Sequence, residues 1–169
     1  MNAPIQVRRA TVRDADAWLS LVDALADYEK LNRPGAEARQ RLVADAFGER
    51  PRVEVVLAEA GGSVVGYAII LFTYSSFLAL PTLYLEDLFV LERHRGQGAG
   101  YQLFLYCVEE AHRRGCGRME WQVLDWNRPA IEFYEKLGGR QMKEWLPYRM
   151  VRSDMESVLC KMRAGKASG

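Results

Sequence analysis

The N-terminal part of the chain shows a strand pattern followed by two helix patterns. Apolar and polar side chains alternate over residues 5–8, which predicts a first β-strand. Residues 11–14 suit the start of a helix, and apolar residues then recur at helical spacing over residues 18–28. A Pro and a Gly within residues 32–35 end this helix, and residues 37–47 predict a second, shorter one.

A β-hairpin is predicted next. Residues 53–60 and 64–72 are rich in β-branched side chains and flank Gly61-Gly62-Ser63. Glycine adopts the positive φ angles that a tight hairpin turn requires. Residues 82–91 predict a further strand, which leads into a glycine-rich turn.

A long amphipathic helix is predicted over residues 98–114, and Gly115 ends it. Its polar face is expected to carry Glu109, Glu110, Arg113 and Arg114. Residues 119–124 predict another strand.

The C-terminal part predicts one more helix and one more strand. Asn127 is a favourable helix cap, Pro129 suits the first helical turn, and Gly138-Gly139 ends the pattern. Residues 155–162 predict a last strand.

This order of elements indicates one α/β domain, in which helices flank a central mixed β-sheet. No repeat or linker divides the 169 residues, so the domain is expected to span residues 1–162. The polar residues 163–169 are expected to form a flexible tail.

Composition and charge narrow the possible partners. Lys and Arg number 23 and Asp and Glu number 22, so no strong field would attract nucleic acid or an anionic membrane. The cysteines are odd in number and not closely spaced, and no apolar run is long enough to span a membrane, which favours the cytoplasm. His94 and His112 lack metal-ligand spacing with those cysteines, so no metal is expected.

The chemistry is expected at the glycine-rich turn, residues 95–100 (Arg-Gly-Gln-Gly-Ala-Gly). Glycines at alternate positions let the backbone approach a ligand, and the start of a helix offers unpaired N–H groups to a phosphate or pyrophosphate. A dinucleotide-binding fingerprint would need Gly at position 101, which is Tyr, and the Gly-Lys-Ser/Thr of a P-loop is missing. By its spacing alone the segment also fits a merely tight strand-to-helix turn.

Several motifs together resemble the GNAT acetyltransferase family, and within it the diamine (spermidine/spermine) and thialysine acetyltransferases. The first is Arg95-x-x-Gly98-x-Gly100 after an apolar strand. The others are residues 25–29 (Leu-Ala-Asp-Tyr-Glu), 84–90 (Tyr-Leu-Glu-Asp-Leu-Phe-Val) and 125–134 (Asp-Trp-Asn-Arg-Pro-Ala-Ile-Glu-Phe-Tyr). The resemblance extends to about residue 160.

The resemblance implies a splayed sheet with acetyl-CoA, the cosubstrate, between the strand ending at Val90 and the strand ending at Leu124. Backbone groups of residues 88–90 would hold the acetyl and pantetheine part, and residues 96–101 the pyrophosphate. The expected cofactor-binding residues are Leu88, Phe89, Val90, Arg95, Gly96, Gln97, Gly98, Ala99, Gly100, Tyr101, Asn127 and Ala130.

Glu86 and Tyr134 are the expected catalytic residues. An alkyl amine of pKa near 10.4 is only roughly 0.04% neutral at pH 7, so direct acetyl transfer requires a base. Glu86 interrupts an apolar strand and could take that proton, directly or through water, or could only bind the substrate cation. By the resemblance Tyr134 donates to the leaving sulfur, whereas its helical spacing alone suggests a core residue.

The substrate is expected to be a primary amine of a small molecule: a diamine, a polyamine or a thialysine-like amino acid. The expected substrate-binding residues are Tyr28, Glu29, Glu86, Asp87 and Trp121. Ser75 stands where the polyamine enzymes carry Asp, and Arg33 lies near a loop that is acidic in them, which disfavours a long polyamine.

Two alternatives stay open, a protein or peptide N-acetyltransferase and a non-catalytic CoA-binding module. The resemblance and the aromatic segment 145–148 (Trp-Leu-Pro-Tyr) also predict a homodimer.

Overall fold

The computed structural model describes residues 4–166, and the chain divides into two compact units, Met1–Gln122 and Val123–Gly169. Strands and helices of the first unit are β1 (Ile5–Arg9), α1 (Ala15–Glu29), α2 (Ala36–Phe47), β2 (Glu54–Ala60), β3 (Ser63–Ser75), β4 (Leu80–Val90), α3 (Ala99–Arg113) and β5 (Arg118–Trp121). The second unit contains α4 (Arg128–Lys136) and α5 (Arg152–Lys166). Short 3-10 turns at Val12–Asp14 and Glu92–His94 precede α1 and the glycine-rich turn.

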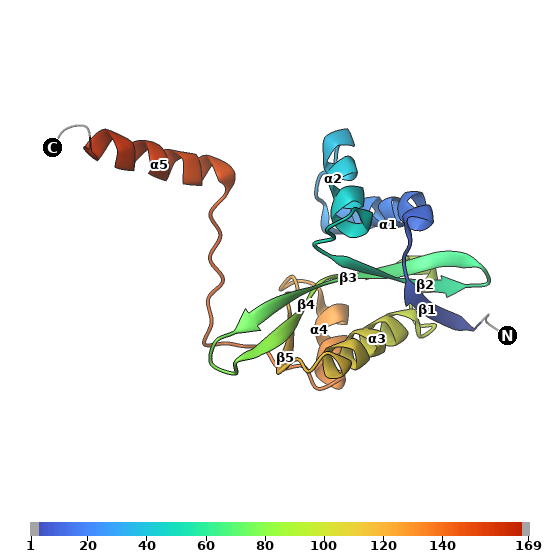
Figure 1. Cartoon of the computed structure of the whole chain (residues 1–169). Coiled ribbons are helices and arrows are strands. Elements are labelled where there is room, and N and C mark those ends of the chain that lie inside the picture. The colour runs from blue at the N-terminus through green and yellow to red at the C-terminus, as the bar shows by residue number, and fades with distance from the viewer. Residues whose placement is uncertain (1–3, 167–169) are drawn as a thin grey trace. The chain divides into compact units, whose positions relative to one another are not determined.

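The five strands form one mixed sheet in the order β1-β2-β3-β4-β5. The first four are antiparallel neighbours, and β5 runs parallel to β4. Figure 1 shows α1 and α2 on one face of this sheet and α3 on the other. The predicted α/β class, with helices on both faces of a mixed sheet, is therefore confirmed.

The central hairpin forms as predicted because its turn residues accept left-handed backbone angles. Gly61 has a φ of 57° and Gly62 a φ of 78°, so both central residues lie where side chains other than hydrogen are disfavoured. This turn sets the antiparallel pairing of Ala60 with Ser63 and of Glu59 with Val64. A bulge at Val65 then shifts the register by one residue, so that Glu54 lies opposite Ile70.

The face of the sheet under α1 holds a buried core. Its members are Trp18, Leu21, Val55, Leu57, Tyr67, Ile69 and Phe89. Phe47 of α2 packs edge-on against Trp18, with ring centroids 5.7 Å apart. Ahead of α1, the predicted start signal is a capping box, in which the Thr11 N–H and hydroxyl both donate to the Asp14 carboxylate at 2.7 and 2.9 Å.

On the other face, α3 carries a buried charge that the sequence places in solvent. Glu110 is only 7% exposed, which corrects its assignment to the polar face of the helix. Arg9 of β1 donates to its carboxylate at 2.8 Å, and Arg114, the residue after α3, does so at 2.7 Å. Hydrogen bonds from Arg113 and Arg114 lower the pKa of Glu110 to about 2. Arg9, one of the three arginines that pair with Glu110, is remote in sequence, so helical periodicity cannot reveal its part in this burial.

Two strand predictions in the C-terminal part need correction. β5 ends at Trp121, so residues 122–124 are not part of it. Residues 155–162 form part of helix α5 and not a strand. Their apolar residues, Met155, Val158, Leu159 and Met162, recur at helical and not alternating spacing.

The helix predicted after Asn127 is present as α4. α4 starts with Pro129 in its first turn, and after it the backbone N–H of Gly139 donates to the Tyr134 carbonyl at 2.9 Å. Residues 163–166 of the expected tail continue α5, and residues 167–169 lie outside the described part of the chain.

Candidate functional site

The candidate site begins where β4 loses one of its two neighbouring strands. β5 pairs with β4 only from Thr82 opposite Arg118 to Leu85 opposite Trp121. β4 then continues to Val90 with β3 alone beside it in the described part of the chain. Apart from the Val90 carbonyl, which accepts from Arg95, backbone groups on the open edge of residues 86–90 face no further strand of the described chain and can bind a ligand that lies along β4.

A β-bulge at Glu86 lies at the start of this open edge. Ile70 of β3 faces Leu85, and the residue before it, Ile69, faces Asp87. Glu86 therefore has no residue opposite it on β3 and is the extra residue of the bulge. Leu85 lies on the α3 face of the sheet, whereas Asp87 and Phe89 lie on the α1 face with Tyr67 and Ile69. The bulge therefore brings the carboxylate of Asp87 to the face that α1 covers.

Asp87 is held there by a tyrosine that sequence reasoning missed. The hydroxyl of Tyr67 donates to Oδ2 of Asp87 at 3.0 Å. Burial raises the pKa of Asp87 to about 6, and the nearby charges of Glu86 and Glu29 act in the same direction, while the Tyr67 hydrogen bond lowers it. A tyrosine within the apolar run of residues 64–72 carries no signal that separates it from a core residue.

The C-terminal end of α1 adds a further acidic residue. Burial raises the pKa of Glu29, the last residue of α1, and its charge also acts on Asp87 and Tyr67. The ring of the preceding residue, Tyr28, lies 6.4 Å from the ring of Phe89. Glu29, Glu86 and Asp87, predicted from motifs far apart in the sequence, thus form one cluster of interacting carboxylates. Such a cluster favours a cation.

The glycine-rich turn follows β4 directly and offers a run of backbone donors. Gly96 has a φ of 72° and Gly98 a φ of 93°, and a Cβ added to either residue would meet no atom within 4 Å. α3 begins at Ala99, and the N–H of Gln102 is the first after Arg95 to find a backbone acceptor in the described residues, Gly98 O at 3.0 Å. The N–H groups of residues 96–101 are therefore available to an anion, and these residues fit a pyrophosphate.

Arg95 connects this turn to α1. Its Nε donates to the carbonyl of Val90 at 3.0 Å, and its guanidinium lies 4.5 Å from the ring centroid of Tyr28 and 5.7 Å from that of Phe89. The contact is a cation–π interaction with two aromatic residues that neighbour members of the carboxylate cluster in sequence. A phosphate contact by Arg95 stays a prediction.

Comparison with known proteins identifies the family of the chain. The family model for the acetyltransferase (GNAT) family matches residues 18–139. The chain belongs to the GNAT family. It is an N-acetyltransferase, and acetyltransferases of this family use acetyl-CoA.

Individual relatives are similar to the chain over different shares of their length. The thialysine N-epsilon-acetyltransferase of Mus musculus is 34% identical over 167 residues, which cover 92% of this chain and 98% of the relative. The enzyme of the same name from Sus scrofa is 33% identical over 170 residues, covering 94% and 99%. L-ornithine N5-acetyltransferase NATA1 of Arabidopsis thaliana is 38% identical over 95 residues, covering 56% and 42%.

Solved structures support the fold. An integron cassette protein from the mobile metagenome of V. cholerae superposes with a TM-score of 0.77 at 22% identity, covering 92% of this chain and 97% of that chain. The aminoglycoside N-acetyltransferase AAC(6')-Iy in complex with CoA gives a TM-score of 0.72 at 19% identity, covering 89% and 97%.

Three of the residues predicted to bind the cofactor or to act in catalysis lie in the second unit. Asn127 precedes α4, and its carbonyl accepts hydrogen bonds from the N–H groups of Ala130 and Ile131, both at 3.1 Å. Tyr134 lies within α4, its ring edge-on to Phe133 with centroids 5.3 Å apart. The cofactor and catalytic roles of Asn127, Ala130 and Tyr134 stay predictions.

Trp121 ends β5 opposite Leu85 of β4, at the point where the two strands part. Its ring packs edge-on against Phe104 of α3, with centroids 5.5 Å apart. This contact accounts for part of the side chain's environment, and a role in substrate binding stays a prediction.

Two residues that the sequence links to weak polyamine binding have local partners. Ser75 is buried, and its Oγ accepts a hydrogen bond from the N–H of Leu78 at 3.3 Å in the β3–β4 turn. Arg33 pairs with Asp27 at 2.5 Å, so its charge is compensated. Arg33 therefore weakens a cation site less than its charge alone suggests.

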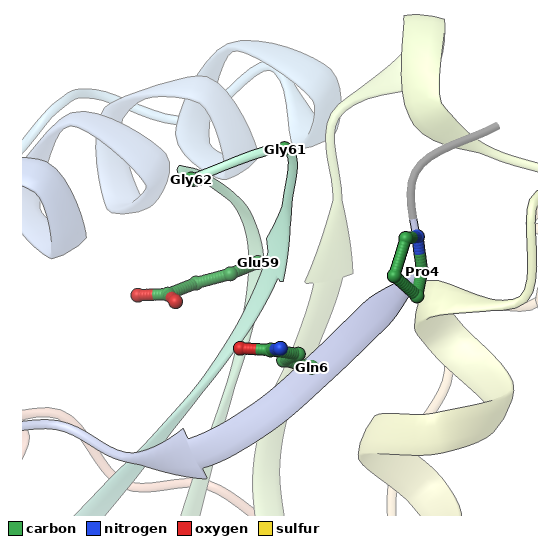
Figure 2. A pocket seen from close by; sticks show the side chains of 5 residues that line it. All are labelled: Pro4, Gln6, Glu59, Gly61 and Gly62. Atoms are coloured by element: carbon green, nitrogen blue, oxygen red, sulfur yellow. The ribbon is translucent and has the colours of Figure 1, made fainter.

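A hollow at the opposite edge of the sheet contains none of the predicted site residues. Figure 2 shows its lining, in which Gln6 of β1 and Glu59 of β2 are register partners beside Pro4 and the Gly61-Gly62 turn. Glu59 is already paired with Arg8 at 2.5 Å. The hollow therefore offers no free charge of its own to a ligand.

Within residues 4–166, no group of His, Cys, Asp and Glu side chains is arranged to hold a metal ion. None of the described helices combines the length and apolar character that crossing a bilayer requires.

Proposed function

We propose that this enzyme transfers the acetyl group of acetyl-CoA to a primary amine of a small molecule that carries a second charged group, such as a short diamine or a thialysine-like amino acid. The observation that carries the proposal is the carboxylate cluster of Glu29, Glu86 and Asp87 beside the open edge of β4. Relatives named thialysine N-epsilon-acetyltransferase align over more than nine-tenths of the chain, which supports this substrate class.

Acetyl-CoA is proposed to lie along the open edge of β4 with its pyrophosphate on the glycine-rich turn. Backbone groups of residues 88–90 on the edge that β5 leaves open would bind the pantetheine amides, although the Val90 carbonyl already accepts from Arg95. The turn would supply the N–H donors of residues 96–101. Gly100 lies beside β4, where an added Cβ would be in ordinary van der Waals contact, 3.8 Å from the side chain of Val90 and 3.9 Å from that of Leu88. Asn127 and Ala130 are also proposed to bind acetyl-CoA.

The proposed reaction needs a proton acceptor for the amine. Bound acetyl-CoA supplies a thioester, whose carbonyl carbon forms the new C–N bond while the C–S bond breaks. Asp87 and Glu29 would bind and orient the substrate ammonium group. Glu86, which is exposed at the bulge, would take the ammonium proton, directly or through a water molecule.

The remaining steps concern negative charge on oxygen and sulfur. A backbone N–H near Phe89, on the open edge of β4, would stabilise the negative charge that develops on the carbonyl oxygen. The Tyr134 hydroxyl would then donate a proton to the departing sulfur, which leaves as a thiol. Glu86 and Tyr134 thus have opposite proton-transfer roles.

A screen of amines tests this proposal. Purified enzyme is mixed with acetyl-CoA and one candidate amine, and the release of free CoA thiol is measured. The amines are thialysine, short diamines, spermidine, a primary amine without a second charged group, and a peptide with a free N-terminal amine. The expected order places thialysine and short diamines above spermidine and well above the other two. Preference for the peptide would indicate a protein N-acetyltransferase instead, and no thiol release with any amine would indicate a CoA-binding module.

The enzyme is also proposed to act as a homodimer in the cytoplasm. Apolar side chains ahead of α5 are strongly exposed, including Trp145 at 72%, Leu146 at 73% and Tyr148 at 91%. A contiguous exposed apolar segment of this kind is typical of an interaction surface. The described cysteines are free thiols, in keeping with a reducing compartment.

A further inference from the structure

Tyr67 has a buried ring and a polar end that must be satisfied. Its exposed fraction is 0%, and its ring lies 6.3 Å from that of Phe89 within the core under α1. A phenol in such surroundings needs a hydrogen-bond partner. Its hydroxyl donates to the carboxylate of Asp87 at 3.0 Å, and Asp87 is itself half-buried.

The backbone fixes this pair. Tyr67 faces Phe89 and Ile69 faces Asp87, so Tyr67 and Asp87 are diagonal neighbours on one face of the β3–β4 ladder. Gly66 keeps the strands closely packed beside them, because a Cβ there would lie 2.7 Å from the carbonyl oxygen of Phe89. A tyrosine ring has two side-chain torsions, and here packing restricts both. The hydroxyl therefore has little freedom to leave Asp87.

The other groups facing Asp87 favour its protonated form. Glu29 approaches from α1 and Glu86 from β4, and both are acidic. Arg95, from the turn after β4, is directed at the rings of Tyr28 and Phe89. The Tyr67 hydrogen bond opposes burial and these charges, because a hydroxyl donor stabilises a carboxylate.

We propose that Tyr67 is a positioning residue for the amine, whose hydroxyl holds Asp87 ionised and in one orientation so that its carboxylate receives the substrate ammonium group. The hydrogen bond occupies Oδ2, which leaves Oδ1 for the amine. This role rests on the proposed function, since it needs an amine that binds at Asp87. It assigns amine recognition partly to a residue within the core.

Tyr67→Phe tests the proposal, because it removes the hydroxyl and keeps the ring. The KM for the amine is expected to rise about tenfold, because the loss of one hydrogen bond to a charged group weakens binding by about that factor. The kcat at saturating amine and the affinity for acetyl-CoA should stay at their wild-type values. The acidic limb of kcat/KM, expected near pH 6 in the wild type, should move to higher pH, since loss of the donor raises the pKa of Asp87 further.

Two comparisons separate positioning from a general loss of stability. Tyr106→Phe removes a hydroxyl that accepts from Arg9 Nε at 3.2 Å, and it should leave the amine KM and the pH profile unchanged. In an Asp87→Asn background, Tyr67→Phe should add little to the amine KM, because the carboxylate it positions is gone. If Tyr67→Phe does not fold, para-aminophenylalanine at position 67, which keeps a donor, should retain the wild-type KM.

The outcomes have distinct meanings. An unchanged amine KM and acidic limb in folded Tyr67→Phe, with an active wild type, would overturn the role of Tyr67 alone. A tenfold rise in the amine KM that Tyr67→Phe still causes in the Asp87→Asn background, or that para-aminophenylalanine at position 67 also causes, would overturn this role as well. A wild type that acetylates no amine would reject the proposed function, and the role of Tyr67 with it.

Discussion

Replacement of Gly98 by alanine separates the anion-binding role of the glycine-rich turn from its role in folding. Gly98 has a φ of 93°, and a Cβ there would meet no atom within 4 Å. The only cost to the folded protein is backbone strain, about 1–2 kcal/mol for a side chain in the left-handed region. A domain of ordinary stability, about 5–15 kcal/mol, survives that loss. The Gly98→Ala protein should therefore fold.

Binding of acetyl-CoA should suffer more than folding does. The new methyl group would project into the open space where the pyrophosphate is proposed to lie, and relief of the strain would turn N–H groups of the turn away from it. A hydrogen bond to a charged group contributes about 1.5–3 kcal/mol, so loss of one such bond weakens binding roughly tenfold to a hundredfold. Titration calorimetry with acetyl-CoA, beside urea denaturation of the same samples, measures both effects.

The chain provides a matched control for the strain. Gly62 has a φ of 78°, and its added Cβ also meets nothing within 4 Å, but it lies in the β2–β3 turn. Gly62→Ala should lose similar stability and keep wild-type affinity for acetyl-CoA. Wild-type affinity in folded Gly98→Ala would show that the turn does not bind the cosubstrate, and equal loss in both variants would trace the defect to stability.

Three further predictions concern catalysis, stability and assembly. Tyr134→Phe should lower kcat by roughly a hundredfold with unchanged acetyl-CoA affinity when chemistry limits turnover, and a wild-type kcat would refute the acid role. Because the pKa of Glu110 is lowered in the folded protein, its contribution to stability is present above about pH 4.5 and is lost as pH falls toward about 2. Urea denaturation should therefore show Glu110→Gln about 2 kcal/mol less stable at pH 7, with the difference shrinking below pH 4.5; a constant difference would contradict this. Light scattering at micromolar concentration should give twice the 19.2 kDa mass of one chain, and the monomer mass would reject the dimer.

The elements that local sequence chemistry determines were predictable. The Gly61-Gly62 turn specifies its hairpin because both residues adopt positive φ, and the start of α4 follows from Pro129 in its first turn. The strand predicted over residues 155–162 was wrong, since the 3–4 residue spacing of its apolar residues is that of a helix.

Features that depend on long-range partners were not predictable. Glu110 pairs with Arg113 and Arg114 nearby and also with Arg9, a residue 101 positions away, and no local pattern reveals the pairing with Arg9. The carboxylates of the cluster were named from family motifs, but their gathering depends on how β4 pairs with β3. The partner of Asp87 is Tyr67, which local pattern cannot distinguish from other apolar strand residues.

The bulge at Glu86 connects the two halves of the proposed chemistry. In a regular strand, Leu85 and Asp87 would lie on one face, and Asp87 would point toward α3, away from Glu29. The extra residue reverses this alternation at the point where β5 ends its pairing with β4. One irregularity thus places Asp87 with Tyr67 and α1, while the next residues of the same strand keep an open edge for the cosubstrate. Because the carboxylate proposed to bind the amine and the backbone proposed to bind the acetyl group are consecutive on β4, their separation is set by covalent geometry and varies little with the mobility of surrounding loops.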